Sequence, residues 1–174
     1  ILGGIVLLAV NPHQWATLRH IDPTYSFDLL ELLSVPIPIS QQVLIFWLLF
    51  LGFAFKAPVF PFHTWLPDAL FEGPIGMAVV LAGLKLGTFG FIRFSIPLLP
   101  EASKSQTVVA VTMALGLAAI LYGAIMALVQ QDFRRLLAFS SISHLGFVVI
   151  GLFALNYQGL QGSLLTMINL GFST

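Results

Sequence analysis

The stretch 107–129 contains no aspartate, glutamate, lysine, arginine or histidine, and Tyr122 is its one ionisable group. A helix needs about 20 mostly apolar residues to cross the hydrocarbon core of a bilayer. The chain as a whole is 58% hydrophobic and 8% charged, whereas soluble domains carry about 25% charged residues. The sequence therefore predicts an all-α protein that crosses a lipid bilayer several times.

The charge balance and the residues that are missing exclude several functions. The formal net charge is zero and no run of basic residues occurs, so we expect no nucleic-acid partner. The sequence contains no cysteine, which excludes disulfides and thiolate-ligated metals or iron–sulfur clusters in this chain. We also find no nucleophile–base arrangement, glycine-rich phosphate loop or metal-binding pattern. We expect this chain to hold no cofactor or metal and to make no bonds itself.

Prolines and polar segments divide the chain into predicted units. Residues 1–10 form the end of a transmembrane helix, which stops at Asn11-Pro12 because proline cannot continue the hydrogen-bond ladder. Residues 11–40 form an extramembrane loop with a short surface helix at 25–33. The remaining predicted transmembrane helices are 41–73 (broken), 74–98, 105–130, 134–155 and 158–174, the last one truncated. We interpret the sequence as part of a longer protein.

A lysine and a cluster of prolines interrupt the helix predicted at 41–73. Lys56 lies about 22 Å along this helix at about 1.5 Å per residue, and a charge near the bilayer centre costs about 2.5–3.5 kcal/mol or more. A broken helix at that depth is tolerated where it lines a wet cavity. The alternative is that Lys56 stands at a helix end and reaches the lipid headgroups. The three prolines that follow it are Pro58, Pro61 and Pro67.

Each proline removes the hydrogen bond to the carbonyl four residues before it, and the freed carbonyls are those of Ala54, Ala57 and His63. We expect these acceptors to be unsatisfied by the backbone. Together with the water they hold, they would solvate the Lys56 ammonium and allow it to exchange its proton. Proton movement is the chemistry that we predict for the break.

Three other ionisable side chains are candidates for the same chemistry. Lys85 lies near the middle of its predicted helix, and it could instead pair with an acidic residue on another helix. His63 is two residues from Trp65 and could be an interfacial ring. His144 lies among serines at 140, 141 and 143 on an otherwise apolar helix, where a packing role is equally compatible with the pattern.

Charged residues also stand near the ends of the predicted helices. Asp68 and Glu72 flank the end of the broken helix, and Arg134 and Arg135 follow the short turn 130–133. We interpret the two acids as mouth residues or helix caps. The two arginines are predicted to make loop contacts.

Long motifs in this order identify a family resemblance. KAPVFPFHTWLPDA at 56–69, LAG at 81–83 followed by Lys85, and DFRRLLAFSSISHLG at 132–146 resemble the antiporter-like subunits of complex I. The type is the one called chain 4 or subunit M, and the D subunit in photosynthetic complexes. The resemblance covers essentially the whole sequence. It implies part of a fourteen-helix subunit, from the end of helix six into helix eleven, with a discontinuous helix seven and no redox cofactor.

The resemblance also implies roles, partners and a location. Lys56 would pair with a glutamate on helix five, and Lys85 would carry the connection onward through the membrane centre. The complex would contain iron–sulfur clusters, use NAD(P)H or ferredoxin with a quinone such as plastoquinone, and surround this chain with other membrane subunits. The turn 130–133 would face the cytoplasm or stroma, and the loop 11–40 the periplasm or lumen.

Two positions depart from the family pattern. Members usually have two more residues between the LAG motif and the helix-eight lysine, and two residues correspond to about 200° of helix rotation. Members also commonly carry a histidine where this chain has Leu170. Both departures favour a specialised paralogue, of the D-subunit type in cyanobacterial thylakoid complexes for CO2 uptake.

Three functions are compatible with these observations. The first is a proton-translocating module driven by electron transfer in other subunits. The second is a subunit of a stand-alone multisubunit cation/proton antiporter, which shares this fold. The third is a non-conducting structural membrane subunit.

Overall fold

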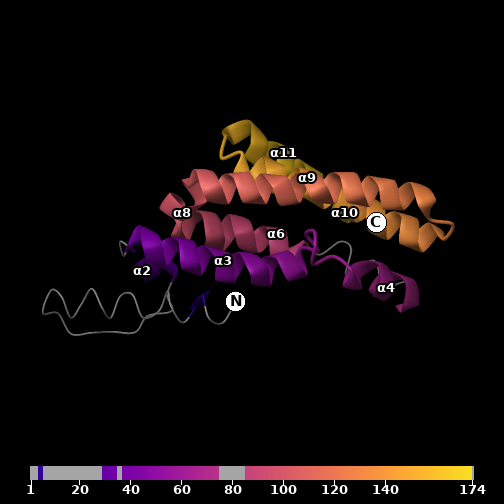
Figure 1. Ribbon diagram of the computed structural model, residues 1–174, viewed down its shortest axis with the longest axis horizontal. Coiled ribbons are helices and arrows are strands. Elements are labelled where there is room, and N and C mark those ends of the chain that lie inside the picture. The colour runs from indigo at the N-terminus through magenta and orange to yellow at the C-terminus, as the bar shows by residue number, and fades with distance from the viewer. Residues whose placement is uncertain (1–3, 6–28, 35–36, 75–84, 174) are drawn as a thin grey trace, which may run out of the picture.

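The computed structural model describes residues 4–5, 29–34, 37–74 and 85–173, and the regular structure in these ranges is helical. Three described helices are long and apolar enough to cross a membrane: α3 (Ile39–Lys56), α9 (Gln106–Val129) and α10 (Phe133–Phe153). Figure 1 shows all three running along the long axis of the molecule. The predicted class, an all-α membrane bundle, is confirmed.

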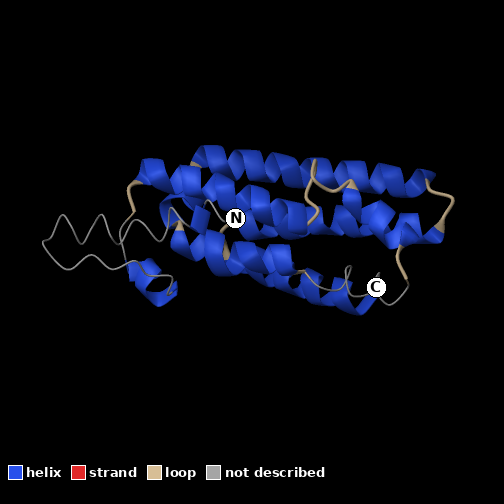
Figure 2. Cartoon of the chain, turned by 90° about the horizontal axis from the view of Figure 1, so that it is seen from below, coloured by secondary structure: helices blue, strands red, loops and turns tan. Residues whose placement is uncertain are grey.

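Shorter helices connect and flank these three. Figure 1 places α2 and α8 near one end of the bundle and α4 toward the other, and Figure 2 shows the longer helices lying roughly parallel with short connections at their ends. The helix predicted at 25–33 corresponds in part to α2, whose preceding residues lie outside the described ranges, as do most of 1–10 and all of 75–84. The shorter helices are α2 (Leu29–Ser34), α4 (Trp65–Glu72), α6 (Leu86–Gly90), the π-helix η1 (Phe91–Ser95), α7 (Ile96–Leu98) and α8 (Pro100–Lys104), followed after α10 by α11 (Tyr157–Ser173).

Local chemistry sets the ends of these helices. Pro38 precedes α3, and its carbonyl accepts hydrogen bonds from the backbone N–H groups of Gln41 and Gln42, both at 3.0 Å. The segments α6, η1 and α7 form one continuous apolar helix, Leu86–Leu98. Its π-helical turn changes the rotation of the residues that follow, as π-bulges do.

Four phenylalanines join the first half of the described chain to α10. Phe46 and Phe50 of α3, Phe91 of η1 and Phe153 of α10 are each 1% exposed or less. Ring centroids lie 5.2 Å apart for Phe50 and Phe91 and 5.8 Å apart for Phe46 and Phe153. Tilted and edge-on ring pairs at these separations are favourable, so this cluster fixes α3 and η1 against α10.

Small residues bring α9 and α10 into close contact. A Cβ atom added to Gly123 of α9 would lie 2.7 Å from the backbone nitrogen of Ser143, and one added to Gly146 would lie 2.6 Å from the carbonyl oxygen of Gly116. Glycine permits such backbone contact between membrane helices. The Ser143 hydroxyl also donates a hydrogen bond to the Ile120 carbonyl at 3.1 Å.

Candidate functional site

The predicted break lies between α3, which ends at Lys56, and α4, which begins at Trp65. Residues 57–64 form turns in place of a helix. The Lys56 side chain is exposed on the described part of the chain and forms no ion pair or hydrogen bond there. The structure therefore places Lys56 at the end of α3, where the break begins.

The backbone of the break satisfies two carbonyls that we expected to be free. The Val59 N–H donates to the Ala54 carbonyl at 3.0 Å, and the Leu66 N–H donates to the His63 carbonyl at 3.1 Å. The prediction was wrong for these two acceptors. Proline removes only the donor four residues ahead, and the turns bring a donor from five or three residues ahead instead.

The Ala57 carbonyl has no donor among the described residues, and the Phe55 carbonyl also loses the donor of a regular helix. In a continuous helix it would accept from the Val59 N–H, but this donor is used by Ala54. The indole Nε1 of Trp65 donates to the Phe55 carbonyl at 2.9 Å. This bond was not among the predictions from the sequence, although an indole donor a few residues beyond a proline break is a signal for it.

Helix α6 packs directly on the break. A Cβ atom added to Gly87 would lie 2.6 Å from both the Ala57 Cβ and the Phe53 carbonyl oxygen. Lys85 stands at the N-cap of α6, two residues before Gly87, and is half-buried. The structure thus brings the two predicted lysines onto segments whose backbones touch, because Ala57 directly follows Lys56.

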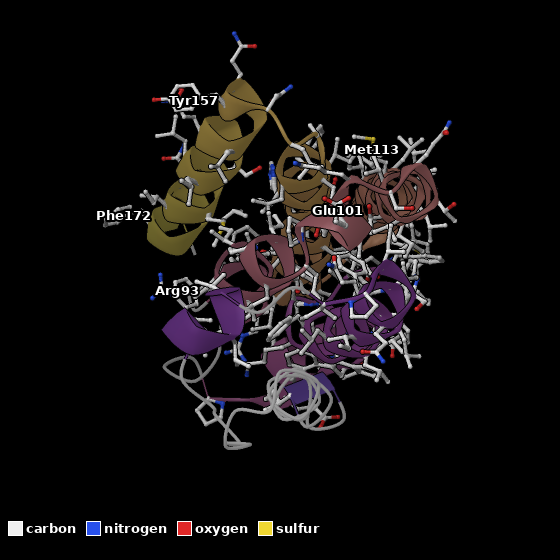
Figure 3. The ribbon with its side chains drawn as sticks, turned by 90° about the vertical axis from the view of Figure 1, so that its left-hand side faces the viewer. Arg93, Glu101, Met113, Tyr157 and Phe172 are labelled. Carbon is white, nitrogen blue, oxygen red and sulfur yellow. The ribbon has the colours of Figure 1, made fainter. Side chains whose placement is uncertain are left out.

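A groove lies beside Lys85, between α6 and α11. Its volume is about 510 Å³, and apart from Lys85 its walls are apolar. In Figure 3, Phe172 lies on α11 at the margin of the molecule. The shortened segment before Lys85 falls in 75–84, outside the described residues, and Leu170 is buried away from this groove. The lining residues are Lys85, Leu86, Phe89, Met167, Ile168, Gly171 and Phe172.

His63 is enclosed by aromatic rings. Its side chain is 3% exposed, stacks on Phe60 with ring centroids 5.5 Å apart, and meets the edge of Tyr122 of α9 at 4.7 Å. Neither imidazole nitrogen has a hydrogen-bond partner among the described residues. A buried imidazole without partners is costly, and among the described residues this ring is held by aromatic contacts alone.

His144 is placed differently. It is exposed on α10, and the ring nearest to it is Phe147, at 6.5 Å between centroids. Of the serines predicted to surround it, Ser141 is buried and Ser143 is bonded to α9. Among the described residues, no hydrogen bond or ring contact joins His144 to the break, whereas His63 belongs to it.

The far end of α4 is held by the two arginines. Arg134 Nη1 donates to the Phe71 carbonyl at 3.3 Å, and Arg135 Cζ lies 4.4 Å from the centroid of the Phe71 ring. Asp68, in the first turn of α4, and Glu72, its last residue, are exposed. No ion pair within the described ranges joins these acids to the arginines. The contact between α4 and α10 combines a cation at a helix C-terminus and over a ring with a buried apolar cluster of Leu66, Leu70, Ala138, Phe139 and Ile142.

The described residues contain no group of three or more histidine, cysteine, aspartate or glutamate side chains that could hold a metal ion. The chemistry available to the site consists of two amines, an enclosed imidazole and backbone groups. The amines and the imidazole can bind and release protons, whereas the backbone groups can only form hydrogen bonds. None is arranged as a nucleophile with a base.

Comparison with known proteins gives consistent matches. Residues 16–174 match the family model described as "NADH:quinone oxidoreductase/Mrp antiporter, TM". The chain is 41% identical over 151 residues to NADH-quinone oxidoreductase subunit M of Rickettsia typhi, which covers 84% of this chain and 30% of that protein. It is 43% identical over 150 residues to NADH-ubiquinone oxidoreductase chain 4 of Marchantia polymorpha, covering 85% and 30%.

A solved structure agrees with these relatives. A chain of the respiratory complex I of Thermus thermophilus with bound NADH superposes with a TM-score of 0.79 at 31% identity, covering 97% of this chain and 36% of that one. The chain thus spans about a third of the length of the proteins it matches.

Proposed function

Because the chain belongs to the NADH:quinone oxidoreductase/Mrp antiporter transmembrane family, we propose that it works as a proton-translocating membrane module of a complex I-type NAD(P)H or ferredoxin:quinone oxidoreductase. Electrons would pass from the donor to the quinone through iron–sulfur clusters in other subunits, since this sequence has no cysteine to ligate one. The partners would be further membrane subunits of the same complex. The observation that carries the proposal is Lys56 at the last residue of α3, beside the break.

The geometry around Lys56 suits a group that gains and loses a proton. The C-terminal end of a helix carries partial negative charge, which favours a cation there. The apolar surroundings penalise the same charge, so small changes in a nearby partner would shift the balance between ammonium and amine. The proton would pass by way of water toward Lys85, whose helix touches the break at Gly87. His63 and His144 are further candidates for the route.

A stand-alone cation/proton antiporter is the second candidate, because the description of the matched family names the Mrp antiporter as well. The two candidates differ in their partners. Copurification with iron–sulfur and quinone-binding subunits supports the first, and sodium-dependent proton exchange by a complex without them supports the second. The paralogue devoted to CO2 uptake in thylakoids stays a prediction.

The proposed function is tested by substituting Lys56. Lys56→Met keeps a side chain of similar length and removes the proton carrier, so we expect coupled proton translocation to fall at least tenfold in the assembled complex. Lys104→Met is the matched control, because Lys104 is exposed at the end of α8. Translocation is measured in vesicles as protons moved per electron transferred. Wild-type stoichiometry in assembled Lys56→Met would favour the structural-subunit hypothesis, which also predicts a silent Lys85→Met.

A further inference from the structure

We propose that Trp65 is a positioning residue for Lys56, and that its indole N–H fixes the last turn of α3 across the helix break. The inference rests on the proposed function, since it assigns a role relative to the Lys56 amine. Contacts at three places support it: at the Phe55 carbonyl, along the backbone on either side of Lys56, and at the far end of α4.

The Phe55 carbonyl lies in the last turn of α3, where the break begins. The break diverts the Val59 N–H to Ala54, so Phe55 has lost the donor that a regular helix would supply. A carbonyl left unpaired at membrane depth is unfavourable. The indole of Trp65 can only donate, and it does so to this oxygen at 2.9 Å. One bond therefore satisfies two groups, and it ties the start of α4 to the end of α3.

The residues on both sides of Lys56 contact other helices. The carbonyl of Phe55, the residue before Lys56, accepts the hydrogen bond from Trp65 of α4. The N–H of Ala57, the residue after Lys56, donates to the Phe53 carbonyl at 2.7 Å, and Ala57 packs closely against Gly87 of α6. The direction of a side chain follows from the backbone that carries it. The backbone on both sides of Lys56 is thus fixed by contacts with two different helices, and this backbone sets the direction of the lysine side chain.

Helix α4, which carries Trp65, is itself anchored on α10. Helix α4 has 8 residues and would be a poor anchor if its other end were free. Its Phe71 is held by Arg134 and Arg135 of α10, through the carbonyl and the ring respectively. Both ends of α4 are therefore fixed. The Trp65 bond connects the last turn of α3, which carries Lys56, through α4 to α10.

The test compares two tryptophan substitutions in the assembled complex. Trp65→Phe retains an aromatic ring and removes the N–H donor. Trp47→Phe is the matched control, because Trp47 of α3 contacts Phe46 and Phe50 through its ring and makes no hydrogen bond to the described residues. Amide hydrogen exchange is measured on peptides that cover the break, and protons moved per electron are measured in vesicles.

For Trp65→Phe we expect exchange at the amides of Ala57 and Val59 to rise by roughly three- to tenfold, the effect of one lost hydrogen bond. We expect the number of protons per electron to fall while electron transfer to quinone continues, a split that a general loss of structure would not produce. Trp47→Phe should change neither quantity. Should Trp65→Phe not assemble, Trp65→Leu provides a second variant without a side-chain donor.

The outcomes separate this inference from the proposed function. If Lys56→Met abolishes translocation but Trp65→Phe matches the wild type in exchange and stoichiometry, the positioning role is refuted and the proposed function stands. If Lys56→Met itself pumps normally, the proposed function fails first. If neither Trp65 variant assembles, the residue acts in folding and the positioning role is overturned.

Discussion

The contact between Gly87 and the break gives the sharpest prediction of stability. In Gly87→Ala, the new Cβ would meet the Ala57 Cβ and the Phe53 carbonyl oxygen at 2.6 Å, whereas ordinary contacts begin at 3.4 Å. The Ala57 backbone nitrogen would lie closer still, so the two backbones must separate by at least about 0.8 Å, and overpacking of this kind costs about 1–3 kcal/mol. Alanine also favours a helix over glycine by up to about 1 kcal/mol, which offsets part of the cost.

Gly162→Ala isolates the packing contribution. Gly162 lies inside α11, and no described atom comes within 4 Å of a Cβ atom added there. The propensity gain is similar for both variants and cancels when they are compared, so Gly87→Ala should be less stable than Gly162→Ala by about 1–3 kcal/mol. The difference is measured as a shift in the thermal denaturation midpoint of the purified complex.

A second readout reports on the site. The Gly87→Ala displacement acts on Ala57, next to Lys56, so amide exchange at Ala57 should rise and protons per electron should fall. Equal denaturation midpoints for the two alanine variants, with unchanged exchange at Ala57, would refute the close contact of α6 with the break.

Two further substitutions test the buried framework. Gln42→Leu removes the amide that donates to the Ile37 carbonyl at 2.8 Å and accepts from the Ala102 N–H at 3.2 Å. This variant should lower the free energy of unfolding by about 1–3 kcal/mol. Gln41→Leu, at an exposed position, is the control, and equal denaturation midpoints for the two variants would contradict the prediction. Phe153→Ala removes a fully buried ring from the phenylalanine cluster and should cost about 3–5 kcal/mol; Phe147→Ala, exposed on the same helix, should cost far less, and the midpoint again decides.

The class of the protein and the location of the break could be predicted from local properties. Long uncharged apolar runs specify membrane helices, and the prolines at 58, 61 and 67 specify an interruption after Lys56 whatever surrounds it. The motifs at 56–69 and 132–146 indicated the family that the matches confirm. The roles of Lys56, Lys85, His63 and His144 in proton transfer stay predictions.

The backbone of the break could not be predicted in the same way. Counting four residues back from each proline identified Ala54 and His63 as free acceptors, but the turns supply other donors to both. That Phe55 loses its helical donor and that Trp65 replaces it emerge only when the path of 57–64 is known. A proline fixes which bond is absent, and the turn that follows decides which bond replaces it.

Composition and proline placement alone determined that this protein is a membrane bundle with a lysine at a broken helix, because burial in lipid and loss of a backbone donor are properties of single segments. Only the tertiary structure decided that Gly87 presses on Ala57, that Tyr122 encloses His63 and that Arg134 and Arg135 hold α4. These contacts join residues far apart in the sequence, and their existence depends on how closely two helix backbones approach, which no single segment encodes.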